Sequence, residues 1–245
     1  MKTKLLAFAL LLLVPTICHA TVKEVMESSC MIFKLIEKEV EEEVTDEDGN
    51  KKTVKKTVLE RRVGSGTLIY QDKERIYILT AGHCTDGHKT LHVIFFNKGV
   101  PCAAMEAELV VQKYVVNTVD DLAIISVAKK LFKDYPIPKA MPLGTKDEKI
   151  TIGRKIVSCG TPGGNWPTAF LGSLGPDFGN AFLFIPKPIK GRSGSAIFDE
   201  DGNKILGVVI AQRGDVGLAV SIKNIYRLLG DHTKPKKPKK PVATK

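Results

Sequence analysis

The sequence lacks internal repeats, and beyond its first residues it also lacks a long apolar run. Repeats of roughly 20 to 50 residues indicate a solenoid, so that architecture is not expected. A transmembrane helix needs about 20 consecutive apolar residues, so we expect no integral membrane span in the body of the chain. The 245 residues suffice for one large all-β domain or two small ones.

The body of the chain also has little net charge, although the whole sequence carries +10. Lys2 and Lys4 contribute two of these charges, and the tail contributes six through Lys234, Lys236, Lys237, Lys239, Lys240 and Lys245. The remaining charge of about +2 gives no reason to expect a specific nucleic-acid surface. Residues 233–245 are predicted to be an extended, disordered tail, either simply solvated or in weak contact with an anionic surface.

The first twenty residues have the three-part pattern of a secretory signal. A basic start precedes ten consecutive apolar residues from Leu5 to Val14, and the segment ends with Cys18-His19-Ala20. A lipoprotein signal ending at Cys18 is a weaker alternative, because Ile17 before it is not small. We therefore expect residues 1–20 to be removed after Ala20, a secreted or periplasmic location, and a folded domain over residues 21–232.

Few cysteines remain once this signal is removed, namely Cys30, Cys84, Cys102 and Cys159. Four cysteines in an exported chain predict two disulfide bonds with three alternative pairings, or buried free thiols. A zinc site formed by Cys84, His88, His92 and Cys102 is a further alternative, since these ligand types suit zinc.

Short β-branched segments separated by turn residues predict an all-β sandwich or a pair of barrels. We expect strands at 31–36, 64–70, 76–80, 91–96, 109–116, 122–127, 156–159, 181–185, 196–198 and 205–211. The Asp48-Gly49 turn, with valine-containing segments on both sides, predicts a hairpin, or otherwise a mobile loop. Ser221 is predicted to cap a short C-terminal helix that Gly230 ends.

Three motifs follow one another in the order histidine, aspartate, serine. They are LTAGHC around His83, DDLAII around Asp121 and KGRSGSA around Ser193. A serine hydroxyl needs a nearby base to become a nucleophile, and an imidazole needs a carboxylate to hold its tautomer. The order differs from that of α/β-hydrolases and subtilisins, and the serine does not lie in a G-x-S-x-G turn. These residues are therefore predicted to form a catalytic triad.

The chain resembles the trypsin-like peptidase family, in its HtrA-type branch, over roughly residues 30–230. The segment GSGTLIY followed by LTAGHC is similar to the family's histidine block, and DLAII resembles its aspartate block. The resemblance selects Asp121 over Asp120. It implies two six-stranded β-barrels with the triad between them and an oxyanion hole from the N–H groups of Gly191 and Ser193. It also implies polypeptide substrates and no cofactor.

Several features depart from the family pattern. Arg192 stands where aspartate or asparagine is common, and Ser195 replaces a common glycine. Gly64 lies about where many members have a cysteine that pairs with the one after the histidine, so Cys84 needs another partner, such as Cys102, or is free. No activation sequence of the Ile-Val-Gly-Gly type is present, and no PDZ domain follows.

The substrate-binding residues are predicted by position alone as Lys187, Ile189, Lys190, Ile210, Ala211 and Gln212. Lys187, Lys190 and Arg192 together would favour an acidic residue before the cleaved bond, whereas Ile189 and Ile210 would form an apolar pocket. An inactive binding module and an esterase remain alternatives to a peptidase.

Overall fold

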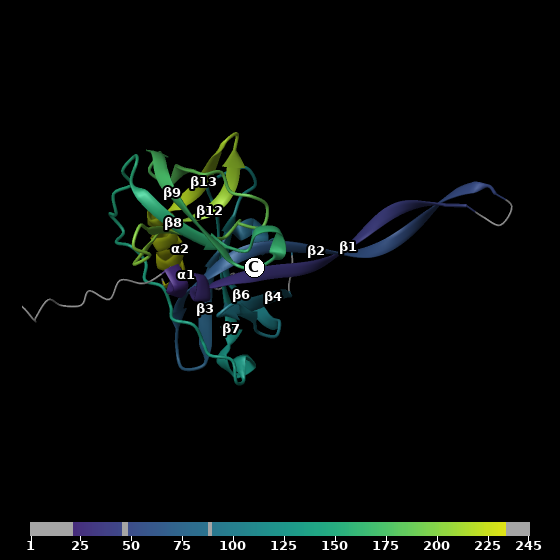
Figure 1. The fold of residues 1–245 in the computed structure, drawn as a ribbon, viewed down its shortest axis with the longest axis horizontal. Coiled ribbons are helices and arrows are strands. Elements are labelled where there is room, and N and C mark those ends of the chain that lie inside the picture. Colours follow the sequence, from purple (N-terminus) through teal and green to yellow (C-terminus); the bar gives the residue numbers. More distant parts are fainter. Residues whose placement is uncertain (1–21, 46–48, 88–89, 234–245) are drawn as a thin grey trace, which may run out of the picture.

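The computed structural model describes residues 22–45, 49–87 and 90–233, with side chains to residue 230. The predicted signal, His88 and the lysine-rich tail from Lys234 lie outside these residues. The described part contains two bodies of β-structure, seen side by side in Figure 1. No helix in this part of the chain has the length and apolar character that crossing a bilayer requires.

The first body is a ring of six antiparallel strands. Its strands are β1 (Ser29–Thr45), β2 (Lys51–Gln71), β3 (Arg75–Thr80), β4 (Leu91–Asn97), β6 (Met105–Tyr114) and β7 (Asp121–Ala128). They are paired in the order β1-β2-β3-β7-β6-β4, and β4 pairs back with β1. The short β5 (Val100–Pro101) pairs with β4 outside the ring. The pairing of β1 with β4 therefore closes the first barrel.

The second body is a closed barrel of six strands, paired in the order β10-β13-β12-β11-β8-β9. Its strands are β8 (Lys155–Gly160), β9 (Thr168–Asp177), β10 (Ala181–Ile185), β11 (Ala196–Asp199), β12 (Ile205–Arg213) and β13 (Val216–Ser221). The double barrel expected from the family resemblance is therefore confirmed. Short 3₁₀ turns lie at η1 (Gly82–Cys84), η2 (Lys129–Phe132) and η3 (Pro162–Gly164).

Side-chain alternation explains how the strands are buried. In β4, Leu91, Val93 and Phe95 are fully buried, as expected for one face of a strand in a barrel wall. Strand β7 is buried on both faces, because Ile125 lies in the core of the first barrel while Ile124 lies in a cluster shared with the second. The strand that begins with Asp121 is thus fixed from both sides.

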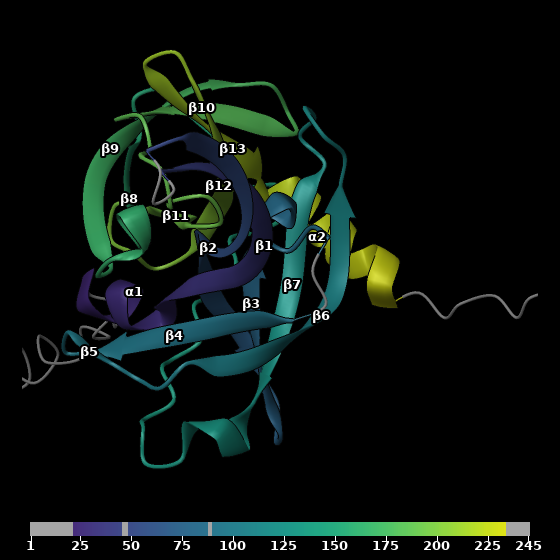
Figure 2. The ribbon, with the colours of Figure 1, turned by 90° about the vertical axis from the view of Figure 1, so that its right-hand side faces the viewer.

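Two helices lie against both barrels, as Figure 2 shows. The first, α1 (Val22–Ser28), contacts β4 of the first barrel and β8 and β9 of the second. The second, α2 (Ile222–Thr233), contacts β6 as well as β12 and β13. The expected helix end at Gly230 is wrong, since α2 continues to Thr233. Ser221 Oγ donates to Gly179 O at 3.0 Å and caps no helix N–H.

The predicted hairpin is confirmed, and it is far longer than a turn between two short strands. Strands β1 and β2 pair from Ser29↔Thr67 to Thr45↔Lys51 without a break in register. The valine-containing segment that follows the turn and the strand expected at 64–70 form one continuous strand, β2. Figure 1 shows the outer part of this hairpin projecting from the barrels as a two-stranded ribbon.

Candidate active site

The ends of three elements bring the predicted triad together. His83 lies in η1, directly after β3, and Asp121 is the first residue of β7, the strand that pairs with β3. Ser193 lies in the loop between β10 and β11 of the second barrel. His83 and Ser193 line the same pocket, with a volume of about 570 Å³, at the junction of the two barrels. The structure therefore places His83 against Asp121, and it opens His83 and Ser193 to one pocket.

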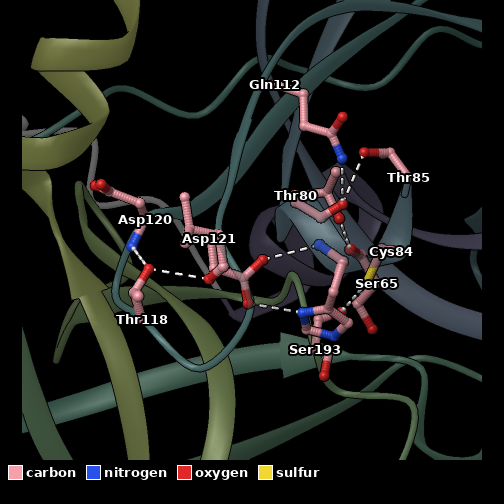
Figure 3. A network of polar contacts seen from close by, with 12 residues as sticks. Ser65, Thr80, Cys84, Thr85, Gln112, Thr118, Asp120, Asp121 and Ser193 are labelled. Carbon is pink, nitrogen blue, oxygen red and sulfur yellow. Dashed lines mark hydrogen bonds and ion pairs between the residues drawn. The ribbon is translucent and has the colours of Figure 1, made fainter. Parts of the chain in front are cut away.

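Asp121 holds His83 through both of its carboxylate oxygens (Figure 3). Its Oδ2 lies 2.7 Å from His83 Nδ1, and its Oδ1 accepts a hydrogen bond of 2.8 Å from the His83 backbone N–H. The carboxylate is buried, with 6% of the residue exposed. Gly82 permits this approach, because a Cβ there would lie 3.1 Å from Asp121 Oδ1.

Two opposing effects act on the pKa of His83. Burial lowers the pKa, while hydrogen bonds to Asp121 and Cys84 and the charges of both groups raise it to about 10. The Asp121 carboxylate therefore stabilises the imidazolium, the form that the ring takes after it accepts a proton.

Ser193 Oγ makes no hydrogen bond to His83 or to any other group among the described residues. Catalytic hydrogen bonds are often long in an unliganded site and shorten when substrate binds. Ser193 is half-buried and lines the pocket that it shares with His83. The arrangement therefore pairs an imidazole with a carboxylate and places a serine in the same pocket as the imidazole.

The loop before Ser193 is held by hydrogen bonds to both barrels. Gly163 N–H donates to Lys190 O at 2.8 Å, and Ser65 Oγ donates to Gly191 O at 2.8 Å. The Lys190 C=O and the Gly191 N–H belong to one peptide group, and a trans peptide points these two groups in opposite directions. The hydrogen bond from Gly163 to Lys190 O therefore turns the Gly191 N–H away from Gly163. Within the described part of the chain, neither Gly191 nor Ser193 donates its backbone N–H to a partner. Both groups remain available to a developing oxyanion.

Ser65 is a site residue that the sequence reasoning missed. Its backbone N–H donates to Ser193 O at 2.7 Å, and its Oγ also accepts the N–H of Thr161 at 2.9 Å. One serine of the first barrel thus holds two loops of the second. The family-like GSGTLIY segment marked this residue as part of a strand, but no local signal marked its partners.

Lys34 was also missed, although a signal for it exists. Its Nζ donates to Asp86 O at 2.8 Å and to His83 O at 3.4 Å, which fixes the loop that follows the histidine. The residue is 7% exposed, and burial lowers its pKa. Strict alternation places Lys34 on the same face of β1 as the buried Cys30 and Ile32. An inward-facing lysine in such a strand indicates a specific role.

Arg192 does not reach the pocket. Its Nη2 donates to Thr168 O at 3.0 Å, and its guanidinium lies 4.7 Å from the centre of the Phe170 ring. Burial lowers the pKa of this side chain. Lys187 forms an exposed ion pair with Asp215, at 3.3 Å. Of the three basic residues predicted to act together on substrate, only Lys190 lines the pocket.

The other predicted pocket residues are dispersed. Ile210 is 6% exposed and belongs to the cluster between the barrels, whereas Ile189 is 58% exposed. Gln212 donates to Gly214 O in its own hairpin, and Ala211 is half-buried beside it. The pocket is instead lined by the base of the β1–β2 hairpin, through Lys34, Glu60, Arg61, Arg62 and Val63.

The predicted disulfide bonds are absent, because the four described cysteines are free thiols. Cys84 Sγ lies 3.6 Å from Ser193 O, whereas Cys102 Sγ accepts the Phe95 N–H inside the first barrel. A Cβ placed on Gly64 would lie 2.5 Å from Cys84 Sγ, which confirms that this glycine stands opposite Cys84. The described residues contain no cluster of three metal-binding side chains, and His88 of the zinc alternative lies outside them.

Comparisons with known proteins agree with the double-barrel fold. No curated protein matches the chain. The M. tuberculosis protease Rv3671c, in its active form, has 21% identity and a TM-score of 0.58, over 88% of this chain and 85% of that one. A serine endoprotease from Yersinia pestis has 16% identity and a TM-score of 0.58, over 87% of this chain and 66% of that one. At these identities both structures show a shared fold.

A family model covers more than half of the sequence. The model of the trypsin-like peptidase domain matches residues 64–208, a range that contains His83, Asp121 and Ser193. It begins at the GSGTLIY segment and ends within β12. The chain therefore belongs to the trypsin-like peptidase family.

Proposed function

We propose that this chain is an exported serine endopeptidase that cleaves polypeptides through His83, Asp121 and Ser193. The observation that carries the proposal is the pair of contacts from Asp121 to His83, at 2.7 and 2.8 Å, in a pocket that Ser193 shares. Acyl transfer requires such a pair, because the serine must lose its proton as it attacks.

The reaction begins when Ser193 Oγ attacks the carbonyl carbon of a peptide bond while His83 Nε2 accepts its proton. The oxyanion that forms is bound by the backbone N–H groups of Gly191 and Ser193. His83 then protonates the leaving amine, and an acyl-enzyme remains on Ser193. Water attacks this ester with His83 again as the base, which releases the second product and restores the serine.

The pocket supports a preference for acidic segments of substrate. Its wall carries Lys34, Arg61, Arg62 and Lys190, with Glu60 and Asp86 as the opposing charges. Glu60 already lies 3.5 Å from Arg62, and the Lys34 amine is bound to backbone carbonyls. Arg61 and Lys190 are thus the cations through which such a preference would act, and cleavage-site mapping with a peptide library would measure it.

The export part of the proposal rests on residues 1–20 alone. The test is the N-terminal sequence of the chain recovered from an oxidising compartment, where we expect it to begin at Thr21. A chain that keeps its first residues after export would contradict cleavage after Ala20.

The triad is tested with a fluorophosphonate probe, which labels a serine only when it is activated. We expect the chain from Thr21 to be labelled at Ser193 and to hydrolyse an unfolded protein substrate. The Ser193→Ala variant should lose labelling and about four or more powers of ten in rate. An unlabelled, folded chain would instead favour a binding module that keeps the peptidase fold.

A further inference from the structure

The outer part of the β1–β2 hairpin forms an arm that projects from the first barrel (Figure 1). We define the arm as residues 36–45 and 51–60, which pair from Ile36↔Glu60 to Thr45↔Lys51 without a register shift. Most of its side chains are exposed, including Val44 at 45% and Val54 at 48%. A two-stranded ribbon without further packing is only marginally stable in water. The arm therefore presents sheet faces on which the described part of the chain packs nothing.

The two faces of the arm differ in composition. Directly opposed residues lie on the same face of an antiparallel pair. One face, here called the mixed face, has one aliphatic and one charged residue in every pair: Ile36–Glu60, Lys38–Val58, Val40–Lys56, Glu42–Val54 and Val44–Lys52. The opposite face carries a row of glutamates at 37, 39, 41 and 43. Only the mixed face offers an aliphatic stripe along its length.

The mixed face is complementary to a second copy of itself. A two-fold axis that crosses the ribbon at Val40 places β1 over β1 and β2 over β2, with the two arms antiparallel. Ile36 then faces Val44 of the second copy, Val58 faces Val54 of the second copy, and the two Val40 side chains meet at the axis. Every aliphatic side chain of this face meets another aliphatic side chain.

The charges match in the same arrangement. Lys38 faces Glu42 of the second copy, and Glu60 faces Lys52 of the second copy. The two Lys56 side chains meet at the axis, but each already lies 3.8 Å from Glu42 of its own chain. A parallel arrangement would set each aliphatic side chain against a charged one, and a shift by one pair would do the same. The sequence pattern thus selects one orientation and one register.

We propose that two copies of this chain associate through the mixed faces of their arms, antiparallel about a two-fold axis at Val40. The face runs from residue 36 to residue 44 of β1, a length of about 27 Å, so the interface lies at the small end of specific interfaces. An interface of this size predicts a reversible dimer whose population increases with protein concentration. The association goes beyond the proposed peptidase activity and uses no residue of the triad.

Sedimentation velocity across a concentration series tests the association. All chains carry Ser193→Ala, so that self-cleavage cannot affect the result whether or not the chain is a peptidase. We expect the parent chain to shift from monomer to dimer as its concentration rises. Lys38→Glu sets like charges together at both symmetric contacts, and so does Glu42→Lys. Each change alone should weaken association about tenfold.

Mixing the two variants separates a lost contact from a damaged arm. In the mixed dimer, the new carboxylate at position 38 faces the new amine at position 42, and the native Glu42 faces the native Lys38. An equimolar mixture should therefore associate as strongly as the parent, which two misfolded arms would not do. Glu41→Lys, on the opposite face, is the control and should leave association unchanged. A parent chain that stays monomeric, or a mixture no stronger than either variant, would overturn the proposal.

Discussion

Gly191 has a backbone conformation that a side chain would disturb. Its φ is +93°, and a Cβ at this position would lie 2.6 Å from Thr161 O and 2.7 Å from Gly163 N. Gly191→Ala must shift the loop, and in the proposed mechanism this moves an N–H group that binds the oxyanion. We expect a rate of Ser193 acylation lower by about 10²- to 10³-fold, measured with the fluorophosphonate probe.

Gly179→Ala is the matched control for that variant. Gly179 has a similar φ of +83°, but a Cβ there would meet nothing within 4 Å. The substitution carries the same backbone cost without the crowding, so labelling should proceed at the parent rate. Equal losses in the two variants would mean that the position of the Gly191 N–H does not control acylation.

The pH profile of labelling depends on the pKa of His83, since only the neutral imidazole accepts the serine proton. Raised to about 10, this pKa makes the rate climb with pH across the neutral range. Cys84 contributes to the raised pKa of His83. Cys84→Ser should therefore move the increase in labelling rate to lower pH, whereas Cys102→Ser should not. The raised pKa also stabilises the fold below the unfolded value of about 6.5, and this contribution is lost as pH rises through about 10. A pH profile of Cys84→Ser that matches the parent's would contradict the contribution of the Cys84 thiol to the pKa of His83.

His83, Asp121 and Ser193 could be singled out from the sequence because each lies within a short motif of its own. LTAGHC and DLAII mark strand boundaries, and KGRSG contains the glycine that the loop requires. Ser65 was not predictable, because its partners Thr161 and Gly191 lie 96 and 126 residues further along the chain and are brought to it only by the packing of the two barrels. The prediction that Arg192 acts on substrate failed for the same reason, since no local sequence feature shows that strand β9 covers this side chain.

The arm is an element whose removal should leave the barrels intact. Replacing residues 38–58 with Asn-Gly joins Glu37 to Leu59, a directly opposed pair, through a two-residue hairpin turn. Because most of the described residues in this deletion are exposed, we expect a melting temperature within about 4 °C of the parent and unchanged labelling of Ser193. Thermal unfolding followed by circular dichroism measures the first result, and the fluorophosphonate probe measures the second.

A shorter deletion is the control for the arm. Replacing residues 42–54 with Asn-Gly joins Glu41 to Lys55 and removes only the outer half of the ribbon. Both deletions should unfold in one transition like the parent. If the longer deletion alone unfolded over a broader temperature range or at a lower temperature than the parent, the inner half of the arm would be shown to support the first barrel.

Strands whose sequences alternate apolar and polar residues were easier to predict than strands whose place is defined by the closing of a barrel. Strand β9 contains the sequence GSLGPD, which reads as a loop, yet it pairs with both β8 and β10 to close the second barrel. Helix α1 has only seven residues and follows the predicted signal, so it carries no periodic pattern of its own. In β2, the change from a charged to an apolar composition near Val63 suggested two strands where one continues.

At the scale of the whole molecule, three apolar clusters hold the fold together. One fills the first barrel around Phe95, and another fills the second around Phe182. The third lies between the barrels and combines Leu122 of β7, Phe198 of β11 and Ile225 of α2. Because His83 and Asp121 come from one barrel and Ser193 from the other, this third cluster sets the spacing of the site.

The role of the third cluster leads to a prediction for α2. Ile225 is fully buried, and truncating such a side chain to alanine destabilises a protein by about 2–5 kcal/mol. Ile225→Ala should therefore lower the free energy of unfolding in urea by that amount, and it should also slow labelling of Ser193, because the barrels are less firmly held. Ile152→Ala is the matched control, since Ile152 is 70% exposed and should change neither quantity. If Ile225→Ala lost stability but kept the parent labelling rate, the barrels would keep their spacing without α2, and the helix would act on stability alone.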